Sequence, residues 1–413
     1  MGRLAINGGA RAITRTWPRW PIADERELEL LREVLDGGTW GGTQFGPKVA
    51  ELNERFARYC DGKYGVALDN GTVTMELTLQ ALGVGPGDEV IVPAYTFIAT
   101  AIVVTHVGAT PVFVDVDPKT VCIDPEAVER AVSGRTKAVI PVHFAGHPCD
   151  MDRLMAVSKK HGVEILEDCA QCHGAIWKGR KLGAVGRAGS YSFQQTKNMP
   201  CGEGGMVVTD DRDLADTINY SMGKFGRGVR DEYETYTYYR LGRNACMSEF
   251  QAAVALAQLE RLEEQTVQRA VNGQVLIDLL DEIEGIEPLR PESYCDRHGW
   301  HLFLFRYKRD VFEGVPKERF AEVLTAEGIE TSVIYPVSLF RQPMYDLERM
   351  TLRGTDHPIR VTSCPESDRA CEEILSFGHN VLLTDREGME QIVGAVRKVQ
   401  ERIGELVEEA AVA

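Results

Sequence analysis

The sequence predicts an α/β protein: a large, mostly parallel sheet between two layers of helices, followed by a smaller α+β region. Over about the first 270 residues, short runs rich in Val and Ile alternate with amphipathic helix patterns. Such alternation is typical of a parallel sheet covered on both faces. After a long helical stretch near 248–283 the pattern becomes mixed. We therefore expect a large domain at 1–270, with an N-terminal segment able to pack on the small domain, and a small domain at 271–413.

The predicted elements follow from apolar runs bounded by turn residues. Gly85-Pro86-Gly87-Asp88, for example, is a turn signal directly before an apolar, β-branched run. The predicted strands of the large region are 64–68, 89–93, 111–116, 138–142, 163–166, 190–193 and 206–209, and its predicted helices start near 72 or span 125–132 and 151–161. In the C-terminal region we expect strands at 301–307 and 330–335, and helices at 316–327, 370–375 and 385–403.

Composition narrows the class of protein. The 413 residues are 44% hydrophobic and 26% charged, which suits a globular protein with a large core. The net charge of −16 disfavours nucleic acid and anionic membranes as partners. No apolar run reaches the ~18 residues of a membrane helix. The N-terminus has no apolar signal region, and Ile6 stands where a myristoylation motif needs Ser or Thr. Ten cysteines are too few for a disulfide scaffold, so we expect free thiols and a cytoplasmic location.

Ligands of open α/β sheets bind beyond the carboxyl ends of the strands. The residues that follow the predicted strands are therefore the first candidates for a site. They are Asn70-Gly71-Thr72, Tyr95-Thr96-Phe97, His143, the segment 168–173 and the loop 194–205.

Asp168 and Lys197 each admit two interpretations. A carboxylate at the buried end of a strand is costly unless it is paired, so Asp168 is either a counter-ion for a protonated heterocycle or a helix cap. Lys197 lies in a loop before the Gly-rich run 202–205. It is either a solvated surface lysine or a lysine that reacts with a carbonyl group, which would need a lowered pKa. Phe97 could face a ring or simply fill the core.

Two further motifs carry weaker signals. Asn70-Gly71-Thr72 ends a strand and opens a helix, which makes it either an anion site, with Ser192 adding a hydroxyl, or an ordinary turn and cap. Cys169-Ala170-Gln171-Cys172-His173 matches the haem-attachment pattern C-x-x-C-H. Haem attachment needs an exported protein, and a single C-x-x-C is weak as a zinc signal. We therefore expect no metal site.

Taken together, these motifs resemble the DegT-type family of fold type I pyridoxal-phosphate (PLP) enzymes, the sugar and cyclitol aminotransferases. The resemblance runs from about residue 21 to 403. It rests on Asp69-Asn70-Gly71-Thr72, the segments 87–93 and 113–117, Pro141-Val142-His143, the segment 167–171, Ser192-Phe193 with Lys197, and the run 202–205. It implies a fold type I PLP-dependent transferase with pyridoxal 5′-phosphate as cofactor.

The family's cofactor residues can be matched one by one. Lys197 matches the lysine that bonds covalently to the cofactor, and Asp168 the carboxylate that pairs with its pyridine nitrogen. Gln171 matches a residue near the phenolic oxygen, and Phe97 the aromatic that stacks on the ring. Asp168 as an anion would favour a protonated pyridine, and Lys197 would act as the general base.

The resemblance also implies phosphate ligands and a dimer. Gly71, Thr72 and Ser192 match residues that bind the phosphate. Asn244 matches an Asn that reaches the phosphate of the neighbouring subunit, which implies an obligate homodimer with shared active sites. Four more residues fall where relatives contact the amino donor or keto acceptor, although each can equally be structural: Tyr95, His143, Tyr335 and His379.

Within the family, the segments 192–195 and 378–383 resemble two branches: the L-glutamine:scyllo-inosose aminotransferases and 3-amino-5-hydroxybenzoate synthase. The leading hypothesis is transfer of an amino group from L-glutamine or L-glutamate to a keto-cyclitol or ketosugar, in aminoglycoside or other secondary metabolism. The first alternative is an aromatising, aminodehydroquinate-type reaction. The second is a non-catalytic regulator on the same fold, which would be expected to lose Lys197 or Asp168. Departures from the family pattern fall at Asn53, His147, Cys169, Cys172 and Cys246.

Overall fold

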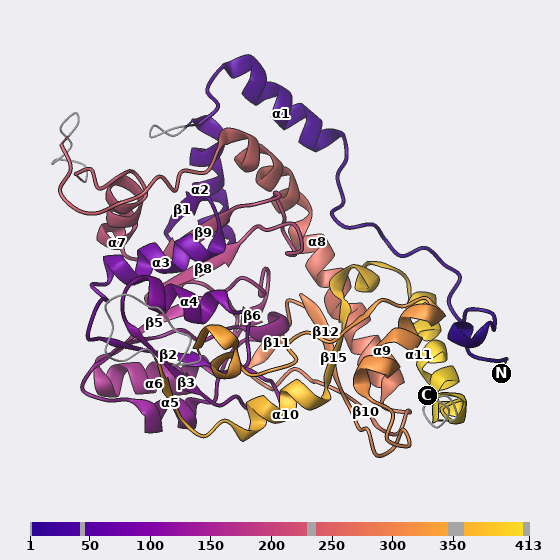
Figure 1. Cartoon of the computed structure of the whole chain (residues 1–413). Coiled ribbons are helices and arrows are strands. Elements are labelled where there is room, and N and C mark those ends of the chain that lie inside the picture. The colour runs from indigo at the N-terminus through magenta and orange to yellow at the C-terminus, as the bar shows by residue number, and fades with distance from the viewer. Residues whose placement is uncertain (1, 42–45, 229–236, 346–358, 408–413) are drawn as a thin grey trace.

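The computed structural model describes residues 2–41, 46–228, 237–345 and 359–407. Figure 1 shows a large lobe built on one sheet and a second lobe built on a smaller sheet, with the first and last described residues both at the second lobe. The ends are tied together there, because the Leu4 N–H donates to the Glu405 carboxylate at 3.2 Å.

The strands are short, as in most α/β proteins. They are β1 (Tyr64–Leu68), β2 (Glu89–Pro93), β3 (Thr110–Val114), β4 (Thr136–Val139), β5 (Glu164–Asp168), β6 (Ile176–Trp177), β7 (Arg180–Lys181), β8 (Ala188–Ser192), β9 (Gly205–Thr209), β10 (Ile286–Pro288), β11 (Cys295–Arg297), β12 (Leu302–Tyr307), β13 (Thr331–Ser332), β14 (Arg360–Val361) and β15 (Ile374–Gly378).

The helices range from one and a half turns to almost nine. They are α1 (Glu25–Gly37), α2 (Pro47–Tyr59), α3 (Gly71–Ala81), α4 (Ala99–His106), α5 (Pro125–Ala131), α6 (Met151–His161), α7 (Arg212–Asp216), α8 (Glu249–Leu280), α9 (Lys317–Glu327), α10 (Pro365–Glu373) and α11 (Arg386–Glu401), with short helical turns that include η2 (Phe144–Gly146) and η7 (His379–Leu383).

The large sheet has the strand order β1-β9-β8-β5-β4-β2-β3-β14. Strand β9 is antiparallel to both of its neighbours, and the other described strands share one direction. The carboxyl ends of β1, β2, β4, β5 and β8 therefore meet at one edge. This edge carries the residues that the sequence singles out.

Alternate side chains of these strands enter two separate cores, because successive strand residues point to opposite faces. Ala67, Ile91 and Ile165 pack in one core with residues of α2, α5, α6 and the first half of α8. Their neighbours Val66, Val90 and Leu166 pack in the other core with residues of α3 and α4. The result is the predicted helix–sheet–helix sandwich, and the fold class is confirmed.

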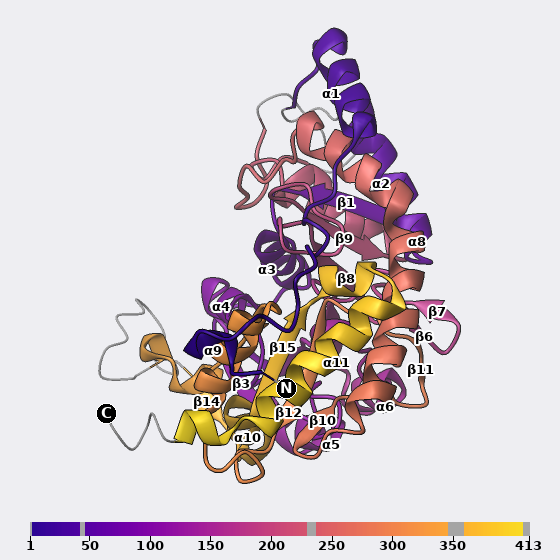
Figure 2. The ribbon, with the colours of Figure 1, turned by 90° about the vertical axis from the view of Figure 1, so that its right-hand side faces the viewer.

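The C-terminal sheet is antiparallel, with the order β10-β12-β15-β13. Its core includes the second half of α8 and also Leu4 and Ile13 from the N-terminus. Figure 2 shows α8 running along both lobes. Two segments pass between the lobes: the N-terminal residues reach the C-terminal core, and β14 adds a parallel strand to the large sheet beside β3.

Two predictions for the C-terminal region are wrong in part. The predicted helix at 370–375 ends at Glu373, because Ile374–Gly378 pairs with β12 and β13 as a strand. Of the predicted strand at 330–335, Thr331–Ser332 forms β13. No helix in the described part of the chain is long and apolar enough to cross a membrane.

Candidate active site

Asp168 ends β5 at the carboxyl edge of the large sheet. It is 4% exposed, and both of its carboxylate oxygens accept hydrogen bonds. Oδ1 accepts from the Ala170 N–H at 3.1 Å, and Oδ2 accepts from Thr100 Oγ at 2.8 Å. Burial raises the pKa of Asp168, while these two hydrogen bonds and the nearby charge of Lys197 lower it. The carboxylate is thus held in place for a positively charged partner.

Lys197 lies half-buried in the loop between β8 and β9, and its N–H donates to Gln194 O at 2.8 Å. Burial lowers the pKa of its side chain, and the negative charge of Asp168 opposes that shift. A lysine with a lowered pKa is more often the neutral amine, which is the nucleophilic form. The structure therefore brings together the two residues that the sequence marks most strongly, a carboxylate and an activated amine.

The start of α3 forms an anion cradle. The Asn70 side chain caps the helix by accepting from the Val73 N–H at 2.9 Å. The N–H groups of Gly71 and Thr72 are the first two of the helix, and such groups have no partner inside a helix. Gly71 packs so closely on Ser192 that an added Cβ would lie 2.8 Å from the Ser192 Cβ. A glycine is therefore needed for the helix start and the Ser192 hydroxyl to share one small space.

Three aromatic side chains pack together near the Asp168 carboxylate. The Tyr95 ring is 5.4 Å from both the Phe144 ring and the Tyr335 ring, in edge-to-face geometry. Burial raises the pKa of Tyr335, as does the charge of Asp168, whereas a contact with Gln171 lowers it. Tyr95 and Tyr335 thus lie together near Asp168 and Gln171, as the prediction of a substrate role requires.

Phe97 and Gln171 differ in exposure. Phe97 follows β2 and is 55% exposed, so its ring has a free face. Gln171 is buried, and its Oε1 accepts from the Ala145 N–H at 2.7 Å. That bond fixes the turn after β5 against η2, while the same side chain also contacts Tyr335.

The surroundings of His143 favour the structural one of the two interpretations that the sequence left open. It is fully buried, its Nδ1 accepts from the Cys149 N–H at 3.0 Å, and its Nε2 lies 3.1 Å from the Glu167 carboxylate. Burial alone would lower the pKa of His143, but interactions with Cys169 and Glu167 raise it to about 10. The geometry favours a positioning role over the predicted contact with substrate, because both ring nitrogens already have protein partners.

His379 adjoins the loop of Lys197, whereas Asn244 adjoins the segment before the start of α3. His379 is buried, and its Nε2 donates to the Thr196 O at 3.1 Å, directly before Lys197 in the chain. Asn244 is exposed, and its backbone forms an isolated antiparallel β-bridge with Lys224. The carbonyl oxygen of the next residue, Ala245, accepts from the Asp69 N–H at 3.1 Å. Asn244 thus lies near the anion cradle, on the surface of the large lobe.

Two polar residues of the site, Thr100 and Asn198, could not be identified from the sequence. Thr100 bonds to Asp168, but nothing in the sequence of α4 predicts that contact. Asn198 Nδ2 donates to Gly299 O at 2.8 Å, and its Oδ1 lies 3.1 Å from His301 Nδ1. The position of Asn198 directly after Lys197 is the one local signal that could have drawn attention to it.

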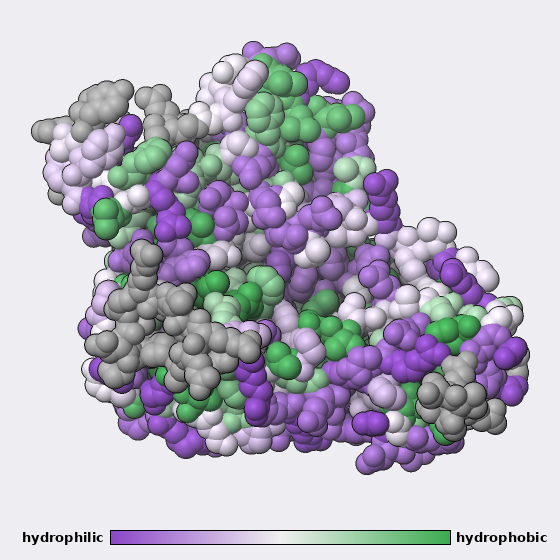
Figure 3. Space-filling view, viewed as in Figure 1, coloured by the Kyte–Doolittle hydropathy of each residue, from purple (hydrophilic) through white to green (hydrophobic). Residues whose placement is uncertain are grey.

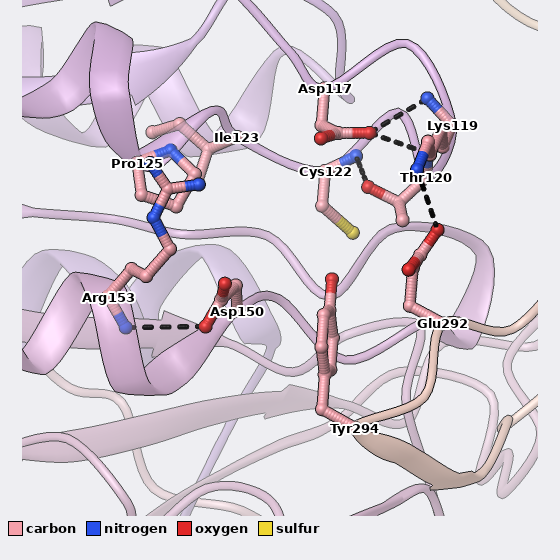
Figure 4. A pocket seen from close by; sticks show the side chains of 10 residues that line it. All are labelled: Asp117, Lys119, Thr120, Cys122, Ile123, Pro125, Asp150, Arg153, Glu292 and Tyr294. Carbon is pink, nitrogen blue, oxygen red and sulfur yellow. Dashed lines mark hydrogen bonds and ion pairs between the residues drawn. The ribbon is translucent and has the colours of Figure 1, made fainter.

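One further side-chain cluster adjoins the site, and one pocket contains none of its residues. The ligand atoms of His143, Cys169 and Cys172 lie within 4.8 Å of one another, but both nitrogens of His143 are already engaged. The prediction of no metal site stays a prediction. Figure 4 shows a small polar pocket lined by residues such as Asp117, Asp150 and Glu292, and it contains none of the predicted site residues.

The arrangement fits pyridoxal phosphate. The anion cradle offers N–H and hydroxyl groups for a phosphate, and Phe97 offers an exposed flat face for a ring. The buried Asp168 carboxylate suits a protonated ring nitrogen, and the amine of Lys197 suits an aldehyde. All four features occur along one edge of the large sheet, and the donor set matches the four chemical parts of this cofactor.

Comparisons with known proteins agree with this geometry. The model of the DegT/DnrJ/EryC1/StrS aminotransferase family matches residues 21–397. The chain is 38% identical to the L-glutamine:scyllo-inosose aminotransferase of Streptomyces griseus, over 98% of this chain and 99% of the relative. It is 37% identical to the L-glutamine:2-deoxy-scyllo-inosose aminotransferase of Streptoalloteichus tenebrarius, over the same shares of the two chains.

A solved structure is similar over almost the same length. The crystal structure of 3-amino-5-hydroxybenzoic acid synthase superimposes with a TM-score of 0.83 at 34% identity, covering 93% of this chain and 99% of that one. From these matches and from the site geometry, the protein is a member of the DegT/DnrJ/EryC1/StrS aminotransferase family, an enzyme with pyridoxal 5′-phosphate as its cofactor.

Proposed function

We propose that this aminotransferase moves the amino group of L-glutamine, or of L-glutamate, to a keto-cyclitol or related ketosugar in aminoglycoside or other secondary metabolism. The relatives with 38% and 37% identity are named for L-glutamine and for inososes, and they match nearly the whole chain. The structural observation that carries the proposal is the position of Lys197 close enough to the buried Asp168, at the sheet edge, for the charge of each to shift the pKa of the other.

Asp168 and Lys197 have defined chemical tasks in this proposal. Pyridoxal phosphate, when bound, supplies an electron sink for the carbon that loses a proton. The carboxylate of Asp168, at the end of β5, stabilises a positive charge on the ligand's ring. Lys197 Nζ, whose pKa is lowered by burial, takes up a proton and returns it from the same loop.

The remaining residues hold the ligand in position. The N–H groups of Gly71 and Thr72 and the hydroxyl of Ser192 bind an anionic group at the start of α3. Phe97 packs on a flat ring, and Gln171 donates from the turn after β5. Fixing the ligand at several points keeps the reacting atoms at one place relative to Lys197 Nζ.

A homodimer is part of the proposal, because apolar side chains are exposed beside Asn244. Leu241 is 94% exposed, and Phe225 and Tyr239 are close to half exposed. Leu28 and Leu35, seven residues apart on one face of α1, are also more than half exposed. Figure 3 shows hydrophobic side chains gathered over α1. A second copy of this chain would cover these residues and bring Asn244 towards the partner's site. We place the enzyme in the cytoplasm, in keeping with its ten free cysteines.

One alternative reaction has a specific observation in its favour. The similarity to 3-amino-5-hydroxybenzoic acid synthase supports an aromatising reaction on a related carbocyclic substrate. The names of the two sequence relatives favour transamination instead. A regulator without activity is set aside, since the chain belongs to a family of enzymes.

Two experiments test the proposal. Incubation with scyllo-inosose and L-glutamine should give an amino-cyclitol by mass spectrometry, and an aromatic product from an aminodehydroquinate-type substrate would favour the alternative. Borohydride reduction followed by peptide mapping should place the pyridoxyl group on Lys197. Lys224 provides an internal control, because it is also buried and burial lowers its pKa to about 8. Labelling of Lys224 in place of Lys197 would contradict the assigned mechanism.

A further inference from the structure

Both chain neighbours of Lys197 are held by histidines of the C-terminal lobe. His379, the first residue of η7, donates from Nε2 to the backbone oxygen of Thr196 at 3.1 Å. His301, directly before β12, contacts the Asn198 side chain, with 3.1 Å between His301 Nδ1 and Asn198 Oδ1. The lysine loop, residues 196–198, is therefore anchored to the other lobe on each side of Lys197.

The partners of these histidines determine which ring nitrogen carries the proton. A backbone oxygen can only accept a hydrogen bond, so His379 is protonated at Nε2. Asn198 Nδ2 donates to Gly299 O at 2.8 Å, which leaves Asn198 Oδ1 as the acceptor of the second bond. His301 is therefore protonated at Nδ1. Both histidines act as hydrogen-bond donors to the lysine loop.

Neither imidazole brings a positive charge to the loop. His301 and His379 are 7% and 5% exposed, and their rings stack with 5.8 Å between the centroids. Burial is the main reason that the pKa values of both imidazoles lie well below the ordinary value, and the positive charges of Lys197 and Arg269 add to that shift. Both rings are therefore neutral near pH 7. The pKa of Lys197 is then left to burial and to the charge of Asp168.

The two histidines are themselves fixed to other parts of the site. The His301 N–H donates to Ala145 O at 2.8 Å, and the Ala145 N–H donates to Gln171 Oε1 at 2.7 Å. His301 thus links the lysine loop to η2 and to the turn after β5. On the other side, Asn272 Nδ2 of α8 donates to a backbone oxygen of η7 at 2.8 Å and so holds the turn that carries His379. The lysine loop is therefore positioned relative to both lobes.

We infer that His301 and His379 are positioning residues for Lys197, a neutral clamp that fixes its amine at the sheet edge. Histidine suits this task because a neutral imidazole can still donate a hydrogen bond. Lysine or arginine would donate as a cation, which would disfavour a proton on the nearby amine. A general base must stand at the same place in each turnover, so a held loop serves proton transfer. The inference rests on the proposed role of Lys197, and it gives His379 a task other than contact with substrate.

Crossed amide substitutions in the full-length enzyme test the clamp. The side-chain amide of asparagine can replace a donor at Nδ1, and that of glutamine a donor at Nε2. His301→Asn and His379→Gln, the bond-keeping pair, should retain the bonds to the lysine loop. His301→Gln and His379→Asn, the bond-breaking pair, should lose them. We expect kcat to fall about 10-fold further in the bond-breaking pair, with KM for the amino donor unchanged within about 2-fold.

Two further measurements do not depend on turnover. The visible circular dichroism of bound pyridoxal phosphate reports a fixed orientation of the cofactor, and its amplitude should fall only in the bond-breaking pair. In the apoenzyme, the pH midpoint for labelling of Lys197 by trinitrobenzenesulfonate should be unchanged in the bond-keeping pair, because no charge is removed. Equal dichroism and equal kcat in the two pairs would overturn the inference. A shifted midpoint in the bond-keeping pair would overturn the neutrality of the clamp.

Asn198 gives a second test from the side of the loop, which also serves if a histidine variant does not fold. Asn198→Ala removes the acceptor of the His301 bond, so combining it with His301→Gln should cost little more kcat than either change alone. Losses that multiply would refute the link between these two residues. If the unmodified enzyme shows no turnover with L-glutamine and scyllo-inosose, the proposed function fails, whereas the dichroism and the labelling still decide the clamp.

Discussion

Thr100 Oγ donates a 2.8 Å hydrogen bond to Asp168 Oδ2, and this bond joins α4 to the end of β5. The Ala170 N–H holds the other carboxylate oxygen. Each bond favours the ionised form of Asp168 against the opposing effect of burial. Thr100 is therefore a positioning residue for the carboxylate.

Replacing Thr100 tests this role. Thr100→Val keeps the shape of the side chain but removes the donor, so it should weaken pyridoxal phosphate binding and lower kcat/KM by about 10-fold. Spectrophotometric titration of the apoenzyme and steady-state kinetics would measure both. Thr100→Ser keeps the hydroxyl and should behave like the unmodified enzyme. Equal cofactor affinity in the Val and Ser variants would contradict the assignment.

The charge of Asp168 should be detectable at Lys197. Burial lowers the pKa of Lys197 and Asp168 raises it, so Asp168→Asn should lower that pKa further. In the apoenzyme, labelling of Lys197 by trinitrobenzenesulfonate should have a pH midpoint below that of ordinary lysine, about 10.4. In Asp168→Asn the midpoint should shift to still lower pH. Glu164→Gln, at the exposed start of the same strand, should leave it unchanged. A midpoint that rises in Asp168→Asn would refute this coupling.

The buried pair of His143 and Glu167 should stabilise the fold. Glu167 also accepts from the N–H groups of Gly183, Val185 and Gly186. Glu167→Gln leaves a buried imidazolium without its partner, and it should lower the free energy of unfolding by about 3–5 kcal/mol. Urea denaturation near pH 6 would measure the loss. Glu129→Gln removes a similar but exposed contact with His161 and should have little effect.

The pH dependence of that loss has a definite sign. The pKa of folded His143 is raised to about 10, so its contribution is complete below the ordinary value of about 6.5 and is lost as pH rises towards 10. The pKa of Glu167 is lowered, so its contribution is present above about 4.3 and is lost at lower pH. The difference between the unmodified enzyme and Glu167→Gln should shrink from pH 6.5 upwards. A difference that grows over this range would argue against the ion pair.

Leu241 should matter for assembly. Because it is 94% exposed in the single chain, Leu241→Asp would place a charge in the proposed dimer interface and shift the protein towards monomer. Sedimentation velocity at several concentrations would measure the shift. Val311→Asp, at another exposed apolar side chain, serves as the control and should keep the mass of the unmodified protein. A dimer of unchanged affinity in Leu241→Asp would exclude this surface from the interface.

The sheet was predictable wherever an apolar run stood between clear turn residues. The strands at 64–68 and 89–93 and the helix at 151–161 have their predicted bounds. The prediction failed at 370–375, where the sequence alone does not reveal that Ile374–Gly378 lies between two strands distant in the chain. In such short segments, pairing with distant residues decides between helix and strand.

The site was predictable only in its outline. Asp168 stands at the end of β5 and Lys197 in the loop that follows β8, and the topology of open sheets is enough to nominate such positions. Their individual roles in catalysis stay predictions. The surroundings of His143 could not be predicted from the sequence, because its partner Glu167 lies on the neighbouring strand β5, 24 residues along the chain. The contact of Thr100 with Asp168 likewise depends on three-dimensional packing.

The exchange of segments between the two lobes has a consequence for biosynthesis. The edge strand β14 is translated long after the rest of the large sheet, and Leu4 and Ile13 are buried by residues as late as Leu406. On the ribosome, the first residues to emerge must therefore wait until nearly the whole chain is made before they are covered. The large sheet can form early, but neither lobe can be completed before synthesis ends.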